Sequence, residues 1–138
     1  MAEALTKKTI QFELVSPESL LASEEATMVV IPGEAGDFGV LADHAPLLSS
    51  IRPGVVAVHL PSGEVKKIFV AGGFADVNGK LCSVLAEEAI NVNDLDRAQI
   101  EESFKVLEAA LGSVGDDAVK KSNILRDMDV ARAKLIAG

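Results

Sequence analysis

The sequence predicts an α+β protein, with an antiparallel β-sandwich over residues 1–90 and an antiparallel α-helical hairpin over residues 91–138. Three observations support this. Residues 9–15 alternate between polar and apolar side chains, as in a half-buried strand. Short strand-like segments then recur with turn residues between them, which is typical of sandwiches and barrels. After residue 90 the apolar side chains recur instead at helical spacing.

The first strand places Ile10, Phe12 and Leu14 on one face. Further strands are expected at residues 27–31, 39–41, 47–51, 55–60, 65–70, 74–77 and 81–85. The pair Gly72-Gly73 is expected to form a turn between two of them. Asn78-Gly79 lies between apolar flanks and predicts a hairpin with a type I′ turn, which has positive φ at both central residues.

Two amphipathic helices are expected after the sandwich. Asn93 can cap the first, with Asp94 and Asp96 in its first turn, and Gly112 can end it. The apolar stripes of the two helices are Ile100, Phe104, Leu107 and Leu111, then Ile124, Met128, Ala131 and Leu135. Helices this short, joined by a few residues, are expected to fold back on each other.

Composition excludes several classes of protein. The 138 residues carry a formal net charge of −8 and contain no Trp or Tyr, which argues against nucleic-acid binding. Cys82 is the only cysteine, so neither an intrachain disulfide nor a Cys-rich zinc site can form. No apolar run is long enough to span a membrane, and the opening residues MAEALTKK lack the apolar core of a signal peptide, so we expect neither secretion by that route nor membrane insertion.

The sequence offers little for catalysis. Asp43 and His44 are adjacent and Ser49 and Ser50 follow, but neighbours on an extended segment point to opposite faces and no Gly-x-Ser-x-Gly motif is present. The two histidines have no metal-binding spacing. Glycines at 33, 36 and 39 match neither a P-loop nor a dinucleotide fingerprint. We therefore expect no catalytic residue, no metal and no cofactor.

Several motifs together point to a known family. IPGEAGDFGVLADHAPLL is followed by IRPGVV, FVAGGFADV and SVLAEEAI. In this order and spacing they resemble the epsilon subunit of bacterial F-type ATP synthases, which corresponds to the mitochondrial delta subunit. The resemblance extends from Thr9 to the end of the chain, and it implies the same sandwich and helical hairpin.

The resemblance implies a non-catalytic subunit of the central stalk, or rotor, that links the gamma subunit to the c-ring and couples proton flow to ATP synthesis. Glu34, Asp37 and Phe38 are then expected to contact the polar loops of the c-ring, and His44 to lie near gamma. The expected location is peripheral, on the cytoplasmic face of the bacterial inner membrane, with contact to the membrane only through the complex.

The resemblance also implies a regulatory tail. In the family, the hairpin can extend along gamma into the alpha/beta catalytic head, where basic residues oppose ATP hydrolysis. Residues 118–138 are the one basic segment of the chain, with five basic and two acidic residues, and Arg126, Arg132 and Lys134 are the candidates. Inhibition of hydrolysis is left open by the sequence.

Some members of the family bind ATP through Ile/Leu-Asp-x-x-Arg-Ala at the start of the first helix. Here Leu95-Asp96 is kept, but Arg97-Ala98 comes two positions early, about 200° around a helix from the expected direction. Asp96 is thus only the remnant of an ATP motif. The alternative function, from another class, is a stand-alone nucleotide-sensing regulatory domain.

Overall fold

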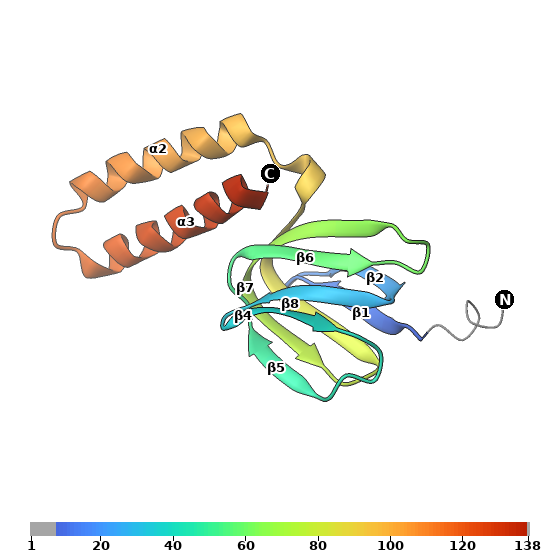
Figure 1. Cartoon of the computed structure of the whole chain (residues 1–138). Coiled ribbons are helices and arrows are strands. Elements are labelled where there is room, and N and C mark those ends of the chain that lie inside the picture. The colour runs from blue at the N-terminus through green and yellow to red at the C-terminus, as the bar shows by residue number, and fades with distance from the viewer. Residues whose placement is uncertain (1–7, 138) are drawn as a thin grey trace. The chain divides into compact units, whose positions relative to one another are not determined.

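The structure is a computed structural model that describes residues 8–137 (Figure 1). It divides into two compact units, one that ends at Ala89 and one that begins at Ile90. The first unit is built of strands and the second of helices, so the predicted α+β class is confirmed.

Eight strands are found in the first unit within the residues that the structure describes. They are β1 (Ile10–Val15), β2 (Leu20–Ala26), β3 (Met28–Gly33), β4 (Gly36–Val40), β5 (Leu47–Ser50), β6 (Gly54–His59), β7 (Val65–Val77) and β8 (Leu81–Asn91). Their order is β2-β1-β8-β7-β6-β3-β4, with β5 paired to β7. The first strand pairs antiparallel with β2 but parallel with β8, an exception to the antiparallel pattern expected.

The core of the sandwich is apolar throughout. Ile10 and Phe12 have no exposed surface and Leu14 has 2%, which confirms the alternation read from the sequence. They pack with side chains from the other strands, among them Val29, Ile31, Val56, Val58, Val77, Cys82 and Val84. Within residues 8–137 no polar or charged side chain is buried, so hydrophobic burial alone accounts for this core.

Two predictions about strands were wrong. The second strand, LLASEEA, was not expected, because its two leading leucines are exposed and give no clear alternation. Gly72-Gly73 is not a turn but lies inside the continuous strand β7, which pairs with β6 through residues 65–70 and with β5 through residues 74–77. Both glycines have positive φ, 69° and 127°, so the strand bends where it changes partner.

The hairpin turn at Asn78-Gly79 forms, but it is not of the predicted type. Gly79 has a φ of 93°, whereas Asn78 is not among the residues with positive φ. The Asn78 and Leu81 backbones bond across the turn, so the loop residues are Gly79 and Lys80. Positive φ at the first loop residue alone is the pattern of type II′ rather than type I′.

The second unit contains a 3-10 turn, η1 (Val92–Asp94), and two helices, α2 (Arg97–Ser113) and α3 (Ala118–Ala137). The predicted cap Asn93 was wrong: Asp96 caps α2, and its side chain accepts a hydrogen bond from the Gln99 amide at 3.2 Å. Gly112 lies inside α2, which ends one residue later. The helices lie side by side and antiparallel (Figure 1).

Candidate functional site

The predicted c-ring residues lie on the hairpin between β3 and β4. Gly33 pairs with Gly36, which leaves Glu34 and Ala35 exposed at the tip. A Cβ added at Gly33 would lie 2.7 Å from the Gly36 carbonyl oxygen and 2.8 Å from the Phe38 ring. The ring therefore lies directly against the turn, and only glycine leaves room for it. Glu34, Asp37 and Phe38 are thus carried by one small, closely packed turn.

Arg52 joins this turn to the rest of the sandwich. Its guanidinium Nη1 donates to the Gly33 carbonyl oxygen at 2.6 Å, and its Nη2 forms an ion pair with Asp37. Backbone bonds run from Arg52 N to Pro32 O at 3.0 Å and from Glu34 N to Ser50 O at 2.9 Å. The end of β5 and the residues that follow it therefore hold the turn in place. Sequence reasoning missed this role, because Arg52 was noticed only as part of IRPGVV.

His44 lies at a second corner, next to the Asn78-Gly79 turn. Asp43 has a φ of 65° and is the only non-glycine residue with positive φ within residues 8–137. Its amide donates to the Gly79 carbonyl at 2.7 Å, and its carboxylate pairs with Lys8 at 2.9 Å. The His44 Nδ1 donates to the Ala45 carbonyl at 2.7 Å, which fixes the orientation of the ring.

This corner does not form a catalytic group. The Asp43 carboxylate bonds to Lys8 rather than to the imidazole. Ser49 Oγ donates to the Ser50 carbonyl at 3.0 Å rather than to His44. A hydrolase needs the base in hydrogen-bond reach of both a nucleophile and an orienting acid, and these pairings supply neither.

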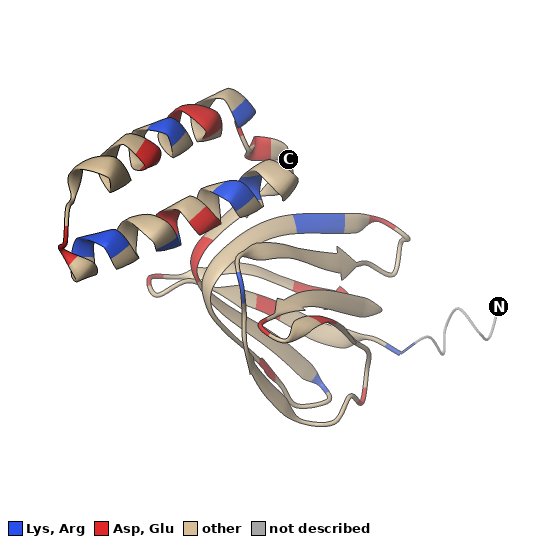
Figure 2. Ribbon diagram, turned by 60° about the vertical axis from the view of Figure 1, so that its left-hand side comes forward, with Lys and Arg blue, Asp and Glu red and all other residues tan. Residues whose placement is uncertain are grey.

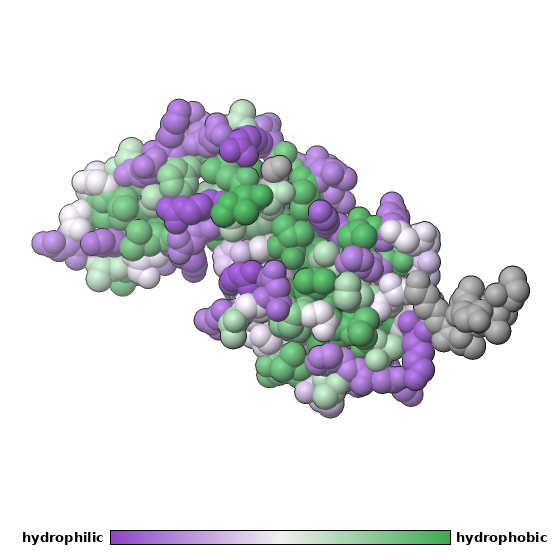
Figure 3. Space-filling view, viewed as in Figure 1, coloured by the Kyte–Doolittle hydropathy of each residue, from purple (hydrophilic) through white to green (hydrophobic). Residues whose placement is uncertain are grey.

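Exposed apolar side chains lie on β5, which comes directly after the His44 corner, and on its partner strand β7. Leu48 on β5 is 67% exposed and Phe74 on β7 is 41% exposed. Ser50 lies opposite Phe74 in the pairing of these strands, so Leu48 and Phe74 are on the same face. We call Leu48 and Phe74 the apolar strip. Figure 3 shows that hydrophobic patches on one face of the molecule are separated from one another by hydrophilic side chains.

The three basic candidates of the last helix have different surroundings. Arg126 pairs with its neighbour Asp127 at 3.7 Å, and Arg132 pairs with Asp129 at 3.0 Å. The Arg132 guanidinium also lies 5.4 Å from the centre of the Phe104 ring, within the range of a cation–π contact. Along α3 the acidic residues lie in the middle, with basic residues on either side of them (Figure 2).

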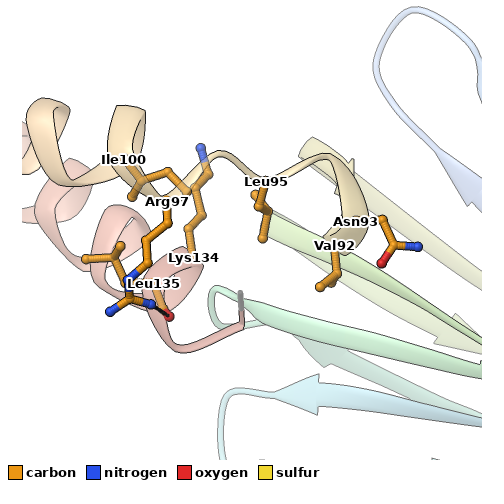
Figure 4. A pocket seen from close by; sticks show the side chains of 7 residues that line it. All are labelled: Val92, Asn93, Leu95, Arg97, Ile100, Lys134 and Leu135. Atoms are coloured by element: carbon orange, nitrogen blue, oxygen red, sulfur yellow. Dashed lines mark hydrogen bonds between the residues drawn. The ribbon is translucent and has the colours of Figure 1, made fainter.

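A small hollow lies between the start of α2 and the end of α3 (Figure 4). Its volume is about 240 Å³, and its lining is Val92, Asn93, Leu95, Arg97, Ile100, Lys134 and Leu135. Arg97 donates to the Leu135 carbonyl at 3.2 Å and to Glu101 at 3.1 Å. Asp96, the predicted remnant of an ATP motif, does not line the hollow and instead caps α2.

Two groups of the described chain have clearly shifted pKa values. Burial raises the pKa of the Cys82 thiol from 9.0 to about 12, so it remains neutral and unreactive at physiological pH. The hydrogen bond to Glu24 raises the pKa of Lys66. No three His, Cys, Asp or Glu side chains in residues 8–137 are grouped to hold a metal ion. Of the helices described, none is both long and apolar enough to cross a membrane.

Fold and surface together define a class: a β-sandwich with a helical hairpin, whose prominent features are a braced acidic turn, an exposed apolar strip and a basic last helix. The family model for the ATP synthase delta/epsilon chain, beta-sandwich domain, matches residues 9–92. The chain therefore belongs to the ATP synthase delta/epsilon family, and the resemblance drawn from the motifs is confirmed.

Individual relatives agree with this assignment. The chain is 47% identical over 128 residues to the ATP synthase epsilon chain of Paramagnetospirillum magneticum, covering 93% of this chain and 96% of the relative. It is 42% identical over 130 residues to the epsilon chain of Rhodospirillum rubrum, covering 94% and 92%. Relatives that are named as one chain of a synthase agree with the prediction of a subunit rather than an enzyme acting alone.

Solved structures share the fold at lower sequence identity. A chain of the Euglena gracilis mitochondrial ATP synthase, in a structure of OSCP, F1 and c-ring, matches with a TM-score of 0.79 and 20% identity, covering 91% of this chain and 78% of that one. A chain of the Tetrahymena thermophila central stalk and c-ring matches with a TM-score of 0.68 and 14% identity, covering 95% and 97%.

Proposed function

We propose that the chain is the central-stalk subunit that links gamma to the c-ring in an F-type ATP synthase and so couples proton flow to ATP synthesis. The observation that carries this proposal is the braced turn with Glu34, Asp37 and Phe38. An exposed acidic loop without a partner would not need such a brace. A loop that transmits torque does, because a preordered contact loses less entropy when its partner binds.

The gamma contact is assigned to the second corner. His44 is held by the bonds around Asp43 and by its own bond to Ala45, and the apolar strip of Leu48 and Phe74 lies on the β5–β7 pair that comes after it. A fixed polar group beside exposed apolar side chains is a combination found at protein interfaces. On this proposal the chain is held peripherally at the cytoplasmic face of a bacterial inner membrane, through its partners.

The helical hairpin is assigned a regulatory role. The hairpin is proposed to open and extend along gamma into the catalytic head, where Arg126, Arg132 and Lys134 contact the beta subunit and oppose ATP hydrolysis. The weak packing between its helices supports this, because a small free-energy difference between two states can be reversed by partner contacts. Only Met128 and Ala131 are buried in α3, and the described part of α2 has no buried residue.

A stand-alone nucleotide sensor is less well supported. Asp96 is occupied as a helix cap, and the hollow beside Arg97 and Lys134 has a volume of about 240 Å³. Pockets for small ligands commonly measure roughly 300–1,000 Å³. The hollow thus offers two cations but too little room to enclose a nucleotide.

The coupling role is tested by Asp37→Lys in the reconstituted ATP synthase. Reversing this charge breaks the pair with Arg52 and places two cations side by side. ATP-driven proton pumping per ATP hydrolysed is expected to fall by about half or more, since repulsion between close like charges weakens the contact by on the order of 1 kcal/mol or more. Gamma is expected to co-purify as before. Unchanged pumping in a fully assembled complex would reject the proposal.

A further inference from the structure

Arg52 spans the two stems of the β3–β4 turn with one side chain. Gly33 is the last residue of β3, and Asp37 is the second residue of β4. The guanidinium bonds to the carbonyl of the first and the carboxylate of the second. It therefore closes the hairpin just below its exposed tip at Glu34 and Ala35, although it lies 15 positions beyond Asp37 in the sequence.

The segment that carries Arg52 is itself fixed. Ile51 is 7% exposed, forms a β-bridge with Gly33 and donates its amide to the Gly73 carbonyl at 3.2 Å. The Arg52 amide donates to Pro32 at 3.0 Å. The side chain thus starts from backbone that is anchored to the core and to the stem of the turn.

Global stability does not explain this arrangement. The side chains of Arg52 and Asp37 are 43% and 61% exposed, and ion pairs between such exposed groups contribute little to folding. Their geometry is more informative. A guanidinium presents its N–H groups in a rigid planar fork, so two acceptors bonded to one fork are held in a fixed relation to each other.

The bond to Arg52 leaves half of the Asp37 carboxylate available. Its Oδ1 accepts from Arg52, and within residues 8–137 no hydrogen bond engages Oδ2. With the side chain 61% exposed, this second oxygen can accept a hydrogen bond from another protein. Fixing one oxygen restricts the rotation of the carboxylate and so orients the other.

We propose that Arg52 is a positioning residue for the contact with the c-ring: it holds the turn closed and orients Asp37 without touching the partner itself. This inference rests on the proposed function, because it names what makes the same turn competent to bind. It predicts that the coupling strength depends on the fork of Arg52 and not only on its charge.

The test uses the full complex carrying Arg52→Gln, Arg52→Lys or Asp37→Lys, with Lys66→Gln as the matched control. Lys66 pairs with Glu24 elsewhere on the sandwich. Lysine keeps the charge of Arg52, but its single ammonium nitrogen lacks the rigid planar fork of the guanidinium. Both Arg52 variants are expected to lower proton pumping per ATP by about twofold or more. The control is expected to leave pumping unchanged.

Amide exchange on the same chains reports the turn directly. The Glu34 amide donates to Ser50, so a loosened turn is expected to exchange about tenfold faster at Glu34 in both Arg52 variants, while Val56 in the core keeps its protection. Faster exchange at Val56 as well would mean that the variants unfold globally, which would overturn a positioning role.

The two proposals fail in different ways. Normal pumping with Arg52→Gln, together with poor pumping with Asp37→Lys, would overturn the role of Arg52 and leave the coupling function standing. Normal pumping with Asp37→Lys would overturn both, because the turn would then not be the contact. Full activity of Arg52→Lys with reduced activity of Arg52→Gln would show that charge alone suffices and would also overturn positioning by the fork.

Discussion

The sandwich and the helical hairpin of this chain bury their apolar side chains to very different degrees. In the sandwich, Phe12 and Phe69 are fully buried, together with most of the strand valines. In the hairpin, the most buried side chains are Met128 at 8% and Ala131 at 7% exposure, whereas Val106, Val119 and Ile136 are 60–81% exposed. The sandwich therefore has a fully packed core, whereas the two helices of the hairpin are held together by few buried side chains.

Because of this difference, the two units are suited to different tasks in one complex. A fully packed sheet keeps its loops in place under load, because displacing one requires the core to open. A thinly packed helix pair depends on helix propensity and a few contacts, so its arrangement can change at low cost. The sandwich is suited to transmit force, and the hairpin to respond to its surroundings.

The largest expected effect comes from Gly73→Ala in the sandwich. A Cβ at Gly73 would lie 1.8 Å from the Leu85 carbonyl oxygen, and its φ of 127° is unfavourable for alanine. Backbone cannot retreat as a flexible side chain can, so a loss of at least about 4 kcal/mol in unfolding free energy is expected. Circular dichroism should show a chain whose strands do not form.

Gly63→Ala separates the two causes of the loss at Gly73, which are the steric overlap with Leu85 and the backbone strain of a positive φ. Gly63 also has positive φ, 94°, but an added Cβ there would meet no atom within 4 Å. It is expected to cost only about 1–2 kcal/mol, the strain of a left-handed residue. If both variants lose the same unfolding free energy, then β7 and β8 can move apart at Gly73 and the sandwich is not rigid there.

Removal of the hairpin tests the other side of the comparison. A chain that ends before α2 is expected to keep its sandwich and to assemble with gamma, and the complex is expected to hydrolyse ATP about twofold faster or more, equivalent to about 0.4 kcal/mol of barrier. Replacing Arg126, Arg132 and Lys134 by Gln should reproduce the increase. Replacing Lys120 and Lys121, at the other end of α3, should not. Unchanged hydrolysis in the shortened complex would reject inhibition.

The sequence predicted the fold well where one signal was sufficient. Alternation placed Ile10, Phe12 and Leu14 in the core, and the change of period located the helices. It was wrong where two signals competed. Gly72-Gly73 has the composition of a turn, yet positive φ also allows a bend within a strand, and only the neighbouring Leu85 backbone decides between them.

The site was harder to predict than the fold. The motifs pointed to the turn and the His44 corner as candidates, but not to the side chains that hold them. Arg52 reaches Asp37 across 15 positions, and Lys8 reaches Asp43 across 35, and pairings at such separations depend on the tertiary fold. A local pattern was misleading in the helix cap too, since Asn91, Asn93 and Asp96 are all suitable capping residues and only geometry selects between them.

The last prediction again replaces glycine by alanine, this time in the hairpin, and it separates the two units most directly. Gly112 lies inside α2 with no atom within 4 Å of an added Cβ, so Gly112→Ala replaces a poor helix former by the best one. The helices should gain about 0.5–1 kcal/mol, less if the end of α2 frays. Amide exchange in α2 and α3 should slow about two- to fivefold, while strand amides in β1 and β8 should not change. If exchange at the strand amides slows equally, the two units open together, and a hairpin that changes its arrangement on an unmoving sandwich is excluded.

Gly115→Ala serves as the control. Gly115 has a φ of 61° in the loop between the helices, so alanine there should destabilise the hairpin and speed exchange in α2 and α3.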